Sequence, residues 1–329
     1  MDALIFALNA VLPIVLTVAL GYFLKRVGLI PQSMSPALNK LVFRVFLPIM
    51  LFLNVYKIEH FSISELSCIG YVVAAVALTF FVMLPIVCAF TKDGKKRGVL
   101  LQGSFRTNYA LIGIPLAESI AGEAGVLTAT ILSAIVVPFY NVLAVISLSI
   151  FGDGQNKPSA KKIIIGILKN PLIDSIALGF VFLGARILCP KVGFDFSPES
   201  IKPLWSVIQN MGALATPLAL LSLGAQFEFS AVKELRRELS FALVTRIVVL
   251  PILGIGAAYL LFSNTFSAGQ FAALIAVFAT PVAVSSVPMT QEMGGDSALA
   301  GQIVVFTTLF SVLSVFCSCF LLRLAGIFG

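Results

Sequence analysis

Long apolar runs follow one another along the whole chain, separated only by short polar linkers. A bilayer core of about 30 Å is crossed by a helix of roughly 20 apolar residues. Because lipid cannot satisfy free backbone groups, each run is predicted to be a helix, whereas a membrane barrel would show shorter segments of alternating hydrophobicity. The sequence therefore predicts an all-α integral membrane protein. The ten predicted spans are residues 4–24, 36–56, 66–91, 98–120, 124–151, 169–189, 203–226, 239–262, 268–292 and 298–326.

The distribution of charge orients these spans. Lysine and arginine outnumber acidic residues by 22 to 15, for a net charge of +7. Most of the basic residues fall in alternate linkers, for example Lys92, Lys95 and Arg97 after the third run. Because cytoplasmic loops carry the excess of Lys and Arg, both termini are predicted to lie on the outer side of the plasma (inner) membrane. The basic charge thus needs no nucleic-acid partner.

Catalytic and metal-binding clusters are not evident in the sequence. The five cysteines are scattered without metal-ligand spacing, and His60 is the single histidine. A membrane-embedded enzyme would need paired carboxylates or a histidine-rich set facing one cavity. We therefore expect no catalytic residue, no metal site and no cofactor, apart from a coupling ion such as H⁺ or Na⁺.

The two halves of the chain repeat each other. Three segments of the first half, 13–23, 47–54 and 114–125, match 171–181, 216–223 and 287–298 in the same order. Since five spans per half is an odd number, the second half must enter the membrane in the opposite orientation, as in the inverted repeats of secondary transporters. We divide the chain into a first five-helix repeat (1–151), a short cytoplasmic linker (152–168) and a second, inverted five-helix repeat (169–329).

Spans four and nine carry helix breakers at corresponding positions. Gly113 and Pro115 lie in span four, and Pro281 and Pro288 lie in span nine. Proline lacks the backbone N–H and clashes with the carbonyl four residues back, while glycine permits a change of course. Paired interruptions of this kind point to the binding site of a secondary transporter. We predict that span four is unwound between Asn108 and Pro115.

Arg106 is the leading candidate for a substrate contact. It lies roughly 13 Å into span four, near the bilayer midplane. A charge at this depth costs at least about 2.5–3.5 kcal/mol, so an anion-binding role is the first hypothesis. The alternatives are a structural ion pair with Glu118, Asp174 or Glu292, and snorkelling of the side chain toward the cytoplasm.

Other polar residues near the breaks are further candidates for substrate binding. Asn108 either contacts the substrate or caps the broken half-helix, and Asn54 either faces the same cavity or bonds to a neighbouring helix. Ser285 and Ser286 could satisfy freed backbone groups and contact substrate. Candidates for ion coupling are Asp174, Glu118 and Glu292, with a solvated carboxylate as the alternative for Glu292. Unwound carbonyls and hydroxyls could instead hold Na⁺, and uncoupled transport is the third possibility.

The motif "NYALIGIP", residues 108–115, resembles the Asn-x-x-x-x-Gly-x-Pro signature of span four in the auxin efflux carrier family. The stretch 279–315 is similar to spans nine and ten of its bacterial members. The resemblance implies ten spans in two inverted five-helix repeats, with broken helices four and nine crossing at Pro115 and near Ser285–Ser286 or Pro288. It also implies that Asn108 lies near the substrate. The bacterial members imply small organic anions such as malate or malonate, and the plant members an auxin-like acid.

The sequence thus predicts a secondary transporter of a small organic anion that works by alternating access. Spans one, two, six and seven are expected to form a scaffold, and a homodimer is an expected assembly. An anion channel is the main alternative and a membrane-embedded enzyme the second. A channel would need a continuous pore, which the paired breaks disfavour.

Overall fold

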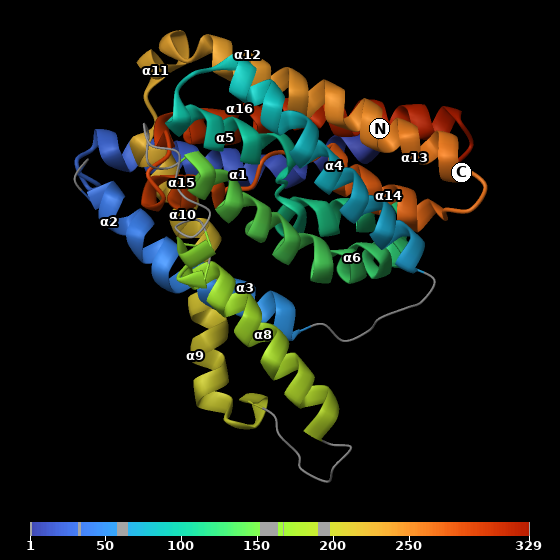
Figure 1. Cartoon of the computed structure of the whole chain (residues 1–329), viewed down its shortest axis with the longest axis horizontal. Coiled ribbons are helices and arrows are strands. Elements are labelled where there is room, and N and C mark those ends of the chain that lie inside the picture. Colours follow the sequence, from blue (N-terminus) through green and yellow to red (C-terminus); the bar gives the residue numbers. More distant parts are fainter. Residues whose placement is uncertain are drawn as a thin grey trace.

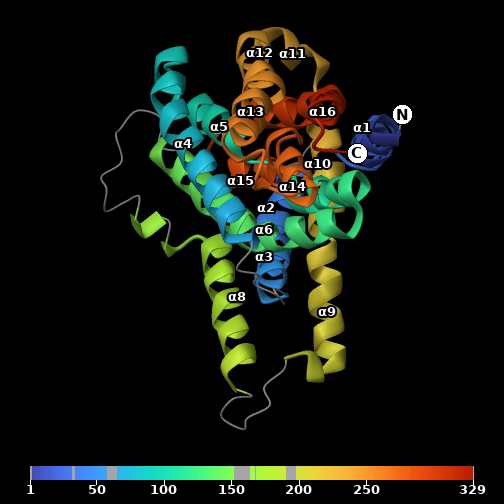
Figure 2. The ribbon, with the colours of Figure 1, turned by 90° about the vertical axis from the view of Figure 1, so that its right-hand side faces the viewer.

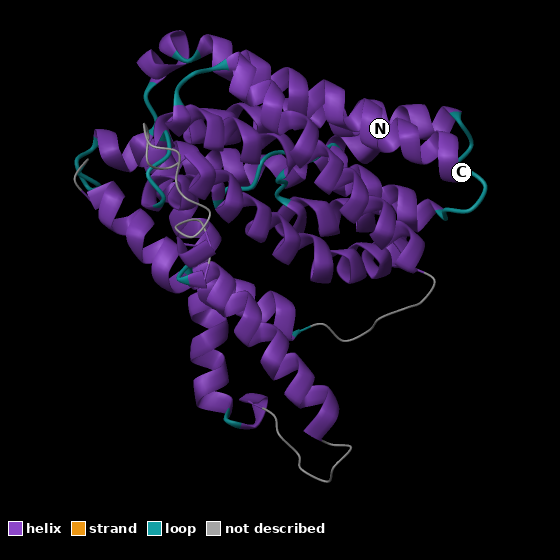
Figure 3. Ribbon diagram, viewed as in Figure 1, coloured by secondary structure: helices purple, strands orange, loops and turns teal. Residues whose placement is uncertain are grey.

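The computed structural model describes residues 2–31, 34–57, 65–151, 164–166, 168–189 and 198–328 (Figure 1). Throughout these ranges the ordered elements are helices, and no strand occurs (Figure 3). Seven described helices are long and apolar enough to cross a membrane. This confirms the predicted all-α membrane class, whereas the ten-span inverted arrangement stays a prediction. The apolar helix α14 (Ala268–Phe278) is shorter than these, and so is α5 (Gly94–Phe105), which carries Lys95, Lys96 and Arg97 at its start; each of the two ends at a break.

The remaining helices follow in chain order. They are α1 (Asp2–Arg26), α2 (Met34–Leu41), η1 (Val42–Phe46), α3 (Leu47–Tyr56), α4 (Leu66–Phe90), η3 (Tyr109–Gly113), α6 (Ile114–Phe151), α8 (Pro171–Leu188), η5 (Pro198–Ser200), α9 (Lys202–Ala213), α10 (Ala215–Gln226), α11 (Phe229–Glu234), α12 (Arg236–Leu243), η6 (Val244–Val249), α13 (Leu250–Phe262), α15 (Ser286–Glu292) and α16 (Ser297–Leu324). Most of the predicted linker 152–168 lies outside the described residues.

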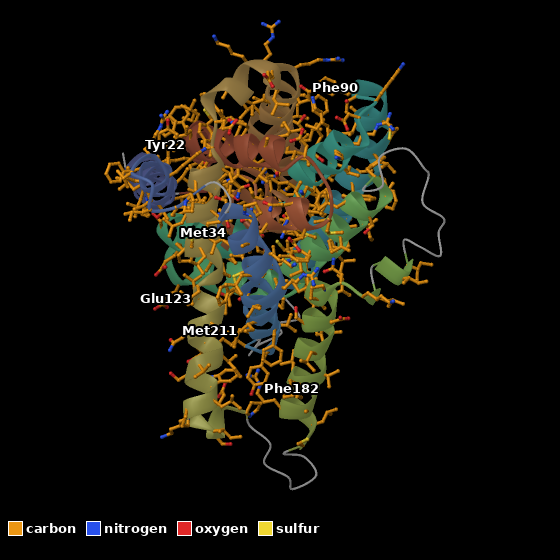
Figure 4. All side chains as sticks on the ribbon, turned by 90° about the vertical axis from the view of Figure 1, so that its left-hand side faces the viewer. Tyr22, Met34, Phe90, Glu123, Phe182 and Met211 are labelled. Carbon is orange, nitrogen blue, oxygen red and sulfur yellow. The ribbon has the colours of Figure 1, made fainter. Side chains whose placement is uncertain are left out.

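The helices form two groups. In the scaffold bundle, which comprises α1, α2, α3, α8, α9 and α10, helix α3 packs on α8 and α9, and α1 packs on α10. The ends of α8 and α9 project from the rest of the molecule (Figure 2). Phe182 of α8 points toward α3, where it packs edge-to-face on Phe52 with the two ring centroids 5.6 Å apart (Figure 4). The crossing bundle comprises α4, α5, α6 and α12 to α16, and its best-packed pair is α6 with α14.

Three helices contain a wide π-helical turn, and each turn ends two residues before a proline. The turns η1, η3 and η6 are followed by Leu47-Pro48, Ile114-Pro115 and Leu250-Pro251. In each case the residue before the proline donates its N–H five residues back, as Ile114 does to Tyr109. A proline inside a regular α-helix would clash with the carbonyl four residues back. The wider turn shifts the backbone hydrogen bonds from the carbonyl four residues back to the one five residues back, so the helix continues past the proline.

Helix α6 contains a sharp reversal rather than one continuous span. Ala121 and Gly122 have non-helical backbone angles, and φ of Gly122 is 58°. A side chain at Gly125 would collide with the carbonyl of Ala117, so the two arms approach closely there. The positive φ of Gly122 would strain any residue except glycine. The reversal divides α6 where the sequence predicts the boundary between spans four and five.

Candidate substrate-binding site

Two broken helices meet through their backbones. Helix α5 ends at Phe105, and α14 ends at Phe278. The Asn108 N–H donates to the Pro281 carbonyl at 2.8 Å, and Thr107 forms an antiparallel bridge with Val282. These bonds satisfy backbone groups that the helix ends leave free, as a membrane interior requires. The break in span four therefore lies at residues 106–108, ahead of the predicted segment 108–115, because the π-helical turn η3 restores helical structure before Pro115.

The break in span nine runs from Ala279 to Ser285, and helical structure resumes in α15. Pro281 lies inside this break, whereas Pro288 lies in the first turn of α15 and is buried. Proline is tolerated in a first turn, where its missing N–H would have no helical acceptor. Of the two prolines predicted to break span nine, Pro281 lies within the non-helical segment. Pro288 lies after it, inside helix α15, and does not break that helix.

Arg106 lies beside the crossing with its side chain 2% exposed. One terminal nitrogen donates to Oδ1 of Asn141 and Oγ of Ser285, both at 2.7 Å. The other donates to Oε1 of Gln102 at 3.4 Å and to the Met289 sulfur at 3.0 Å. All four partners are neutral, and the two ion pairs found among the described residues lie elsewhere. Within the described chain, the guanidinium charge is thus hydrogen-bonded but not neutralised.

Several buried polar atoms at the crossing lack a hydrogen-bond partner within the described chain. They include Nδ2 of Asn108 and Oγ of Ser286. A buried polar group without a partner costs about 1–3 kcal/mol, so such groups tend to meet water or a ligand. The crossing therefore holds donors and hydroxyls that can serve a bound polar molecule.

A cavity of about 760 Å³ separates the scaffold bundle from the start of α6. Its lining includes Asn54, Lys57, Leu111, Pro115 and Gln209. A second cavity of about 600 Å³ flanks the other side of the same segment. Asn54 and Lys57 line both cavities, and Arg186 and Glu199 line the second. These volumes lie in the range of small-molecule sites.

Among the predicted substrate contacts, the structure brings Arg106 and Ser285 into hydrogen-bond contact, with Asn108 and Ser286 at the same crossing. Asn54 lies apart from them in the cavity walls. Neither cavity is lined by Arg106, Asn108, Ser285 or Ser286. The crossing thus forms a polar layer separate from the cavity walls, while Pro115 reaches the larger cavity.

Residues 6–317 match the family model described as membrane transport protein. The chain belongs to this family, the auxin efflux carriers. A protein described as an uncharacterized transporter from Methanothermobacter thermautotrophicus is 21% identical over 323 residues, which cover 93% of this chain and 95% of that protein. The resemblance predicted from the motif at residues 108–115 is therefore confirmed. Family and relative both support a membrane transporter, and they point away from an enzyme.

The candidate coupling residues of this transporter lie away from the crossing. Glu292 at the end of α15 forms an ion pair with Arg44 at 3.4 Å, with 14% of its side chain exposed. Asp174, in the first turn of α8, and Glu118 are exposed. None of the three forms an ion pair with Arg106 in the described structure, so the predicted structural pairing of that arginine is not observed.

Sequence reasoning missed two buried residues in the crossing bundle of the transporter. Asn141 of α6 accepts from Arg106, and Arg246 of η6 is 1% exposed. Both stand as isolated polar residues inside apolar runs, "VVPFYNVLAV" and "ALVTRIVVLP". A lone ionisable or amide side chain within a span is the signal that could have identified them. No group of three or more His, Cys, Asp or Glu residues in the described chain could hold a metal ion.

Proposed function

We propose that this protein is a secondary transporter that carries a small organic anion by alternating access, with ten spans arranged as two inverted five-helix repeats. The observation that carries the proposal is the buried Arg106 beside the antiparallel contact of two broken helices, with only neutral partners. An uncompensated positive charge in a low-dielectric layer favours an anion. The reversal at Gly122 and the turn at Gly294, with φ values of 58° and 75°, each follow a break within the aligned segments 114–125 and 287–298 and support the repeat.

The cavity supplies the approach to this layer. Asn54 offers an amide to a carboxylate, and Lys57 places a cation where the two cavities meet. We propose that the anion enters between the scaffold bundle and α6, then meets Asn108 and the serines at the crossing. Arg106 supplies positive potential from behind the cavity wall. The carrier would lie in the plasma (inner) membrane, with both termini on the outer side.

Uptake into proteoliposomes tests the proposal. Radiolabelled malate, malonate and indole-3-acetate are offered to the wild type, to Arg106→Gln and to Asn54→Ala. Arg323→Gln is a matched control, because Arg323 is exposed in the last turn of α16. Saturable uptake with counterflow is expected, reduced about tenfold or more by Arg106→Gln because the positive potential behind the cavity wall is lost. Arg323→Gln should retain wild-type uptake.

Three results would contradict the proposal. Flux that never saturates and shows no counterflow would indicate a channel. Conversion of the acid to a new compound would indicate an enzyme. Unchanged uptake by a folded Arg106→Gln variant would remove the arginine from anion recognition and leave Asn54, Asn108 and the serines to bind the substrate.

A further inference from the structure

A second buried arginine lies at the other broken helix. Arg246 belongs to the π-helical turn η6, and its side chain is 1% exposed. It lines neither of the two cavities at α6. No acidic side chain accepts a hydrogen bond from it within the described chain, and its partners are backbone carbonyls. Burying a charged guanidinium within a membrane span is costly, so its hydrogen-bond partners should explain why it is there.

The partners of Arg246 are carbonyls at the end of α14. Its Nη2 donates to the Val277 oxygen at 2.9 Å and to the Thr280 oxygen at 2.8 Å. Its Nε donates to the same Thr280 oxygen at 2.9 Å. The last carbonyls of a helix lack intrahelical donors and carry partial negative charge. The guanidinium therefore supplies both hydrogen bonds and the opposite charge.

Pro281 explains why these carbonyls need an outside donor. In a continuing α-helix, the carbonyl of Val277 would accept from the N–H of residue 281. Proline has no N–H, so that position can never supply the bond. Arg246 donates in its place, from a helix that precedes α14 in the sequence. The planar fork of arginine reaches two carbonyls at once, which the single ammonium of lysine does less well.

The capped segment is the one that makes the crossing. Thr280 immediately precedes Pro281, whose carbonyl accepts from the Asn108 N–H, and Val282 pairs with Thr107. Because Arg246 holds the Thr280 carbonyl in place, it also limits movement of the adjacent Pro281 carbonyl, which accepts the hydrogen bond from the Asn108 N–H. The close contact of Gly254 in α13 with the Phe278 ring adds packing support beside the same helix end.

We propose that Arg246 is a positioning residue for transport: it caps α14 at the Pro281 break and so holds Asn108 at the crossing, without touching the substrate. The inference rests on the proposed function where it concerns transport. Its structural step stands independently, because it concerns the hydrogen bond between Asn108 and Pro281.

The structural step is tested by hydrogen–deuterium exchange on the full-length protein in nanodiscs. Arg246→Gln removes the charge, and Arg246→Lys keeps the charge without the fork. Faster exchange is expected at the Asn108 amide and in residues 279–286 for Arg246→Gln, with a smaller increase for Arg246→Lys. Arg323→Gln should match the wild type. Wild-type exchange at Asn108 in both Arg246 variants would overturn the proposal.

The transport step is tested with whichever of malate, malonate and indole-3-acetate shows saturable uptake in the wild type. Arg246→Gln should raise KM about tenfold, and Arg246→Lys should recover part of that loss. A role in folding alone would lower Vmax with the amount of folded carrier and leave KM unchanged, and that result would overturn the positioning role. If the wild type transports none of these acids, the substrate class of the proposed function fails while the exchange experiment still decides the role of Arg246. Should Arg246→Gln fail to fold, Arg246→Lys carries both measurements.

Discussion

At the scale of single residues, the crossing depends on polar side chains that meet from distant parts of the chain. Asn141 accepts a hydrogen bond from Arg106 at 2.7 Å, and its own Nδ2 donates to the Val137 carbonyl at 2.8 Å. The amide is therefore oriented: its oxygen faces the guanidinium because its nitrogen is bonded to the backbone of α6. The terminal nitrogens of Arg106 are therefore hydrogen-bonded to neutral groups, which leave its charge uncompensated.

Replacing Asn141 by Asp tests whether that charge matters. Asn141→Asp places a carboxylate against Arg106 and should preserve folding while lowering anion uptake about tenfold or more, because the positive potential is cancelled. Asn141→Ala leaves the guanidinium without one acceptor and should destabilise the fold by about 1–3 kcal/mol. Thermal unfolding in detergent and proteoliposome uptake separate the two effects. Normal uptake by a folded Asn141→Asp variant would show that the charge of Arg106 does not act on the substrate.

At the scale of helices, small residues set how closely α1 and α10 pack. A side chain at Gly224 would collide with the Val18 carbonyl, and one at Gly21 would collide with the Leu221 carbonyl. Each helix thus presents a glycine to the backbone of the other. Close backbone approach at small residues is a common source of helix association in membranes, where lipid supplies no hydrophobic drive between helices.

Gly224→Ala should therefore destabilise the carrier by about 1–3 kcal/mol, since backbone must shift to admit the methyl group. Gly70→Ala is the matched control, because Gly70 lies in α4 with open space around it. There the methyl group should be neutral or stabilise the helix by up to about 1 kcal/mol. Thermal unfolding in one detergent measures both variants. Equal stability of the Gly224 variant and the wild type would show that α1 and α10 can move apart enough to admit the methyl group without cost.

The helices also show what local sequence can and cannot predict. Apolar length predicted the all-α membrane class, and Pro and Gly marked the neighbourhood of both breaks. The exact break in span four was misplaced, because the π-helical turn η3 depends on a hydrogen-bond register that residue types do not reveal. Apart from Gln102, the partners of Arg106 and Arg246 come from other parts of the chain, up to 183 residues away for Met289. Such contacts are fixed by tertiary packing, so the sequence indicates a buried cation without naming its partner.

At the scale of the whole molecule, one long helical segment joins the cavities to a contact between the two bundles. Residues 34–56 run through α2, η1 and α3. Near its end, Asn54 lines both cavities. Toward its start, Asn39 donates to Gln291 of α15 at 2.5 Å, and Arg44 pairs with Glu292 at 3.4 Å. At 1.5 Å per residue, Arg44 and Asn54 are about 15 Å apart along the segment. This segment therefore contacts the crossing bundle at one end and lines the cavities at the other.

If the proposed alternating access separates the two bundles, the contact of Asn39 and Arg44 with α15 opens during each cycle. A disulfide between Asn39→Cys and Gln291→Cys, in a variant whose five native cysteines are replaced by serine, should stop uptake, and reduction should restore it. The paired control is Lys40→Cys with Gln291→Cys, because Lys40 is exposed beside Asn39 and should cross-link poorly. Gel mobility after proteolysis between the two positions measures the extent of cross-linking, and proteoliposome uptake measures transport. Full transport by the cross-linked Asn39–Gln291 variant would mean that the scaffold and α15 move as one body, and that the cycle opens the molecule elsewhere.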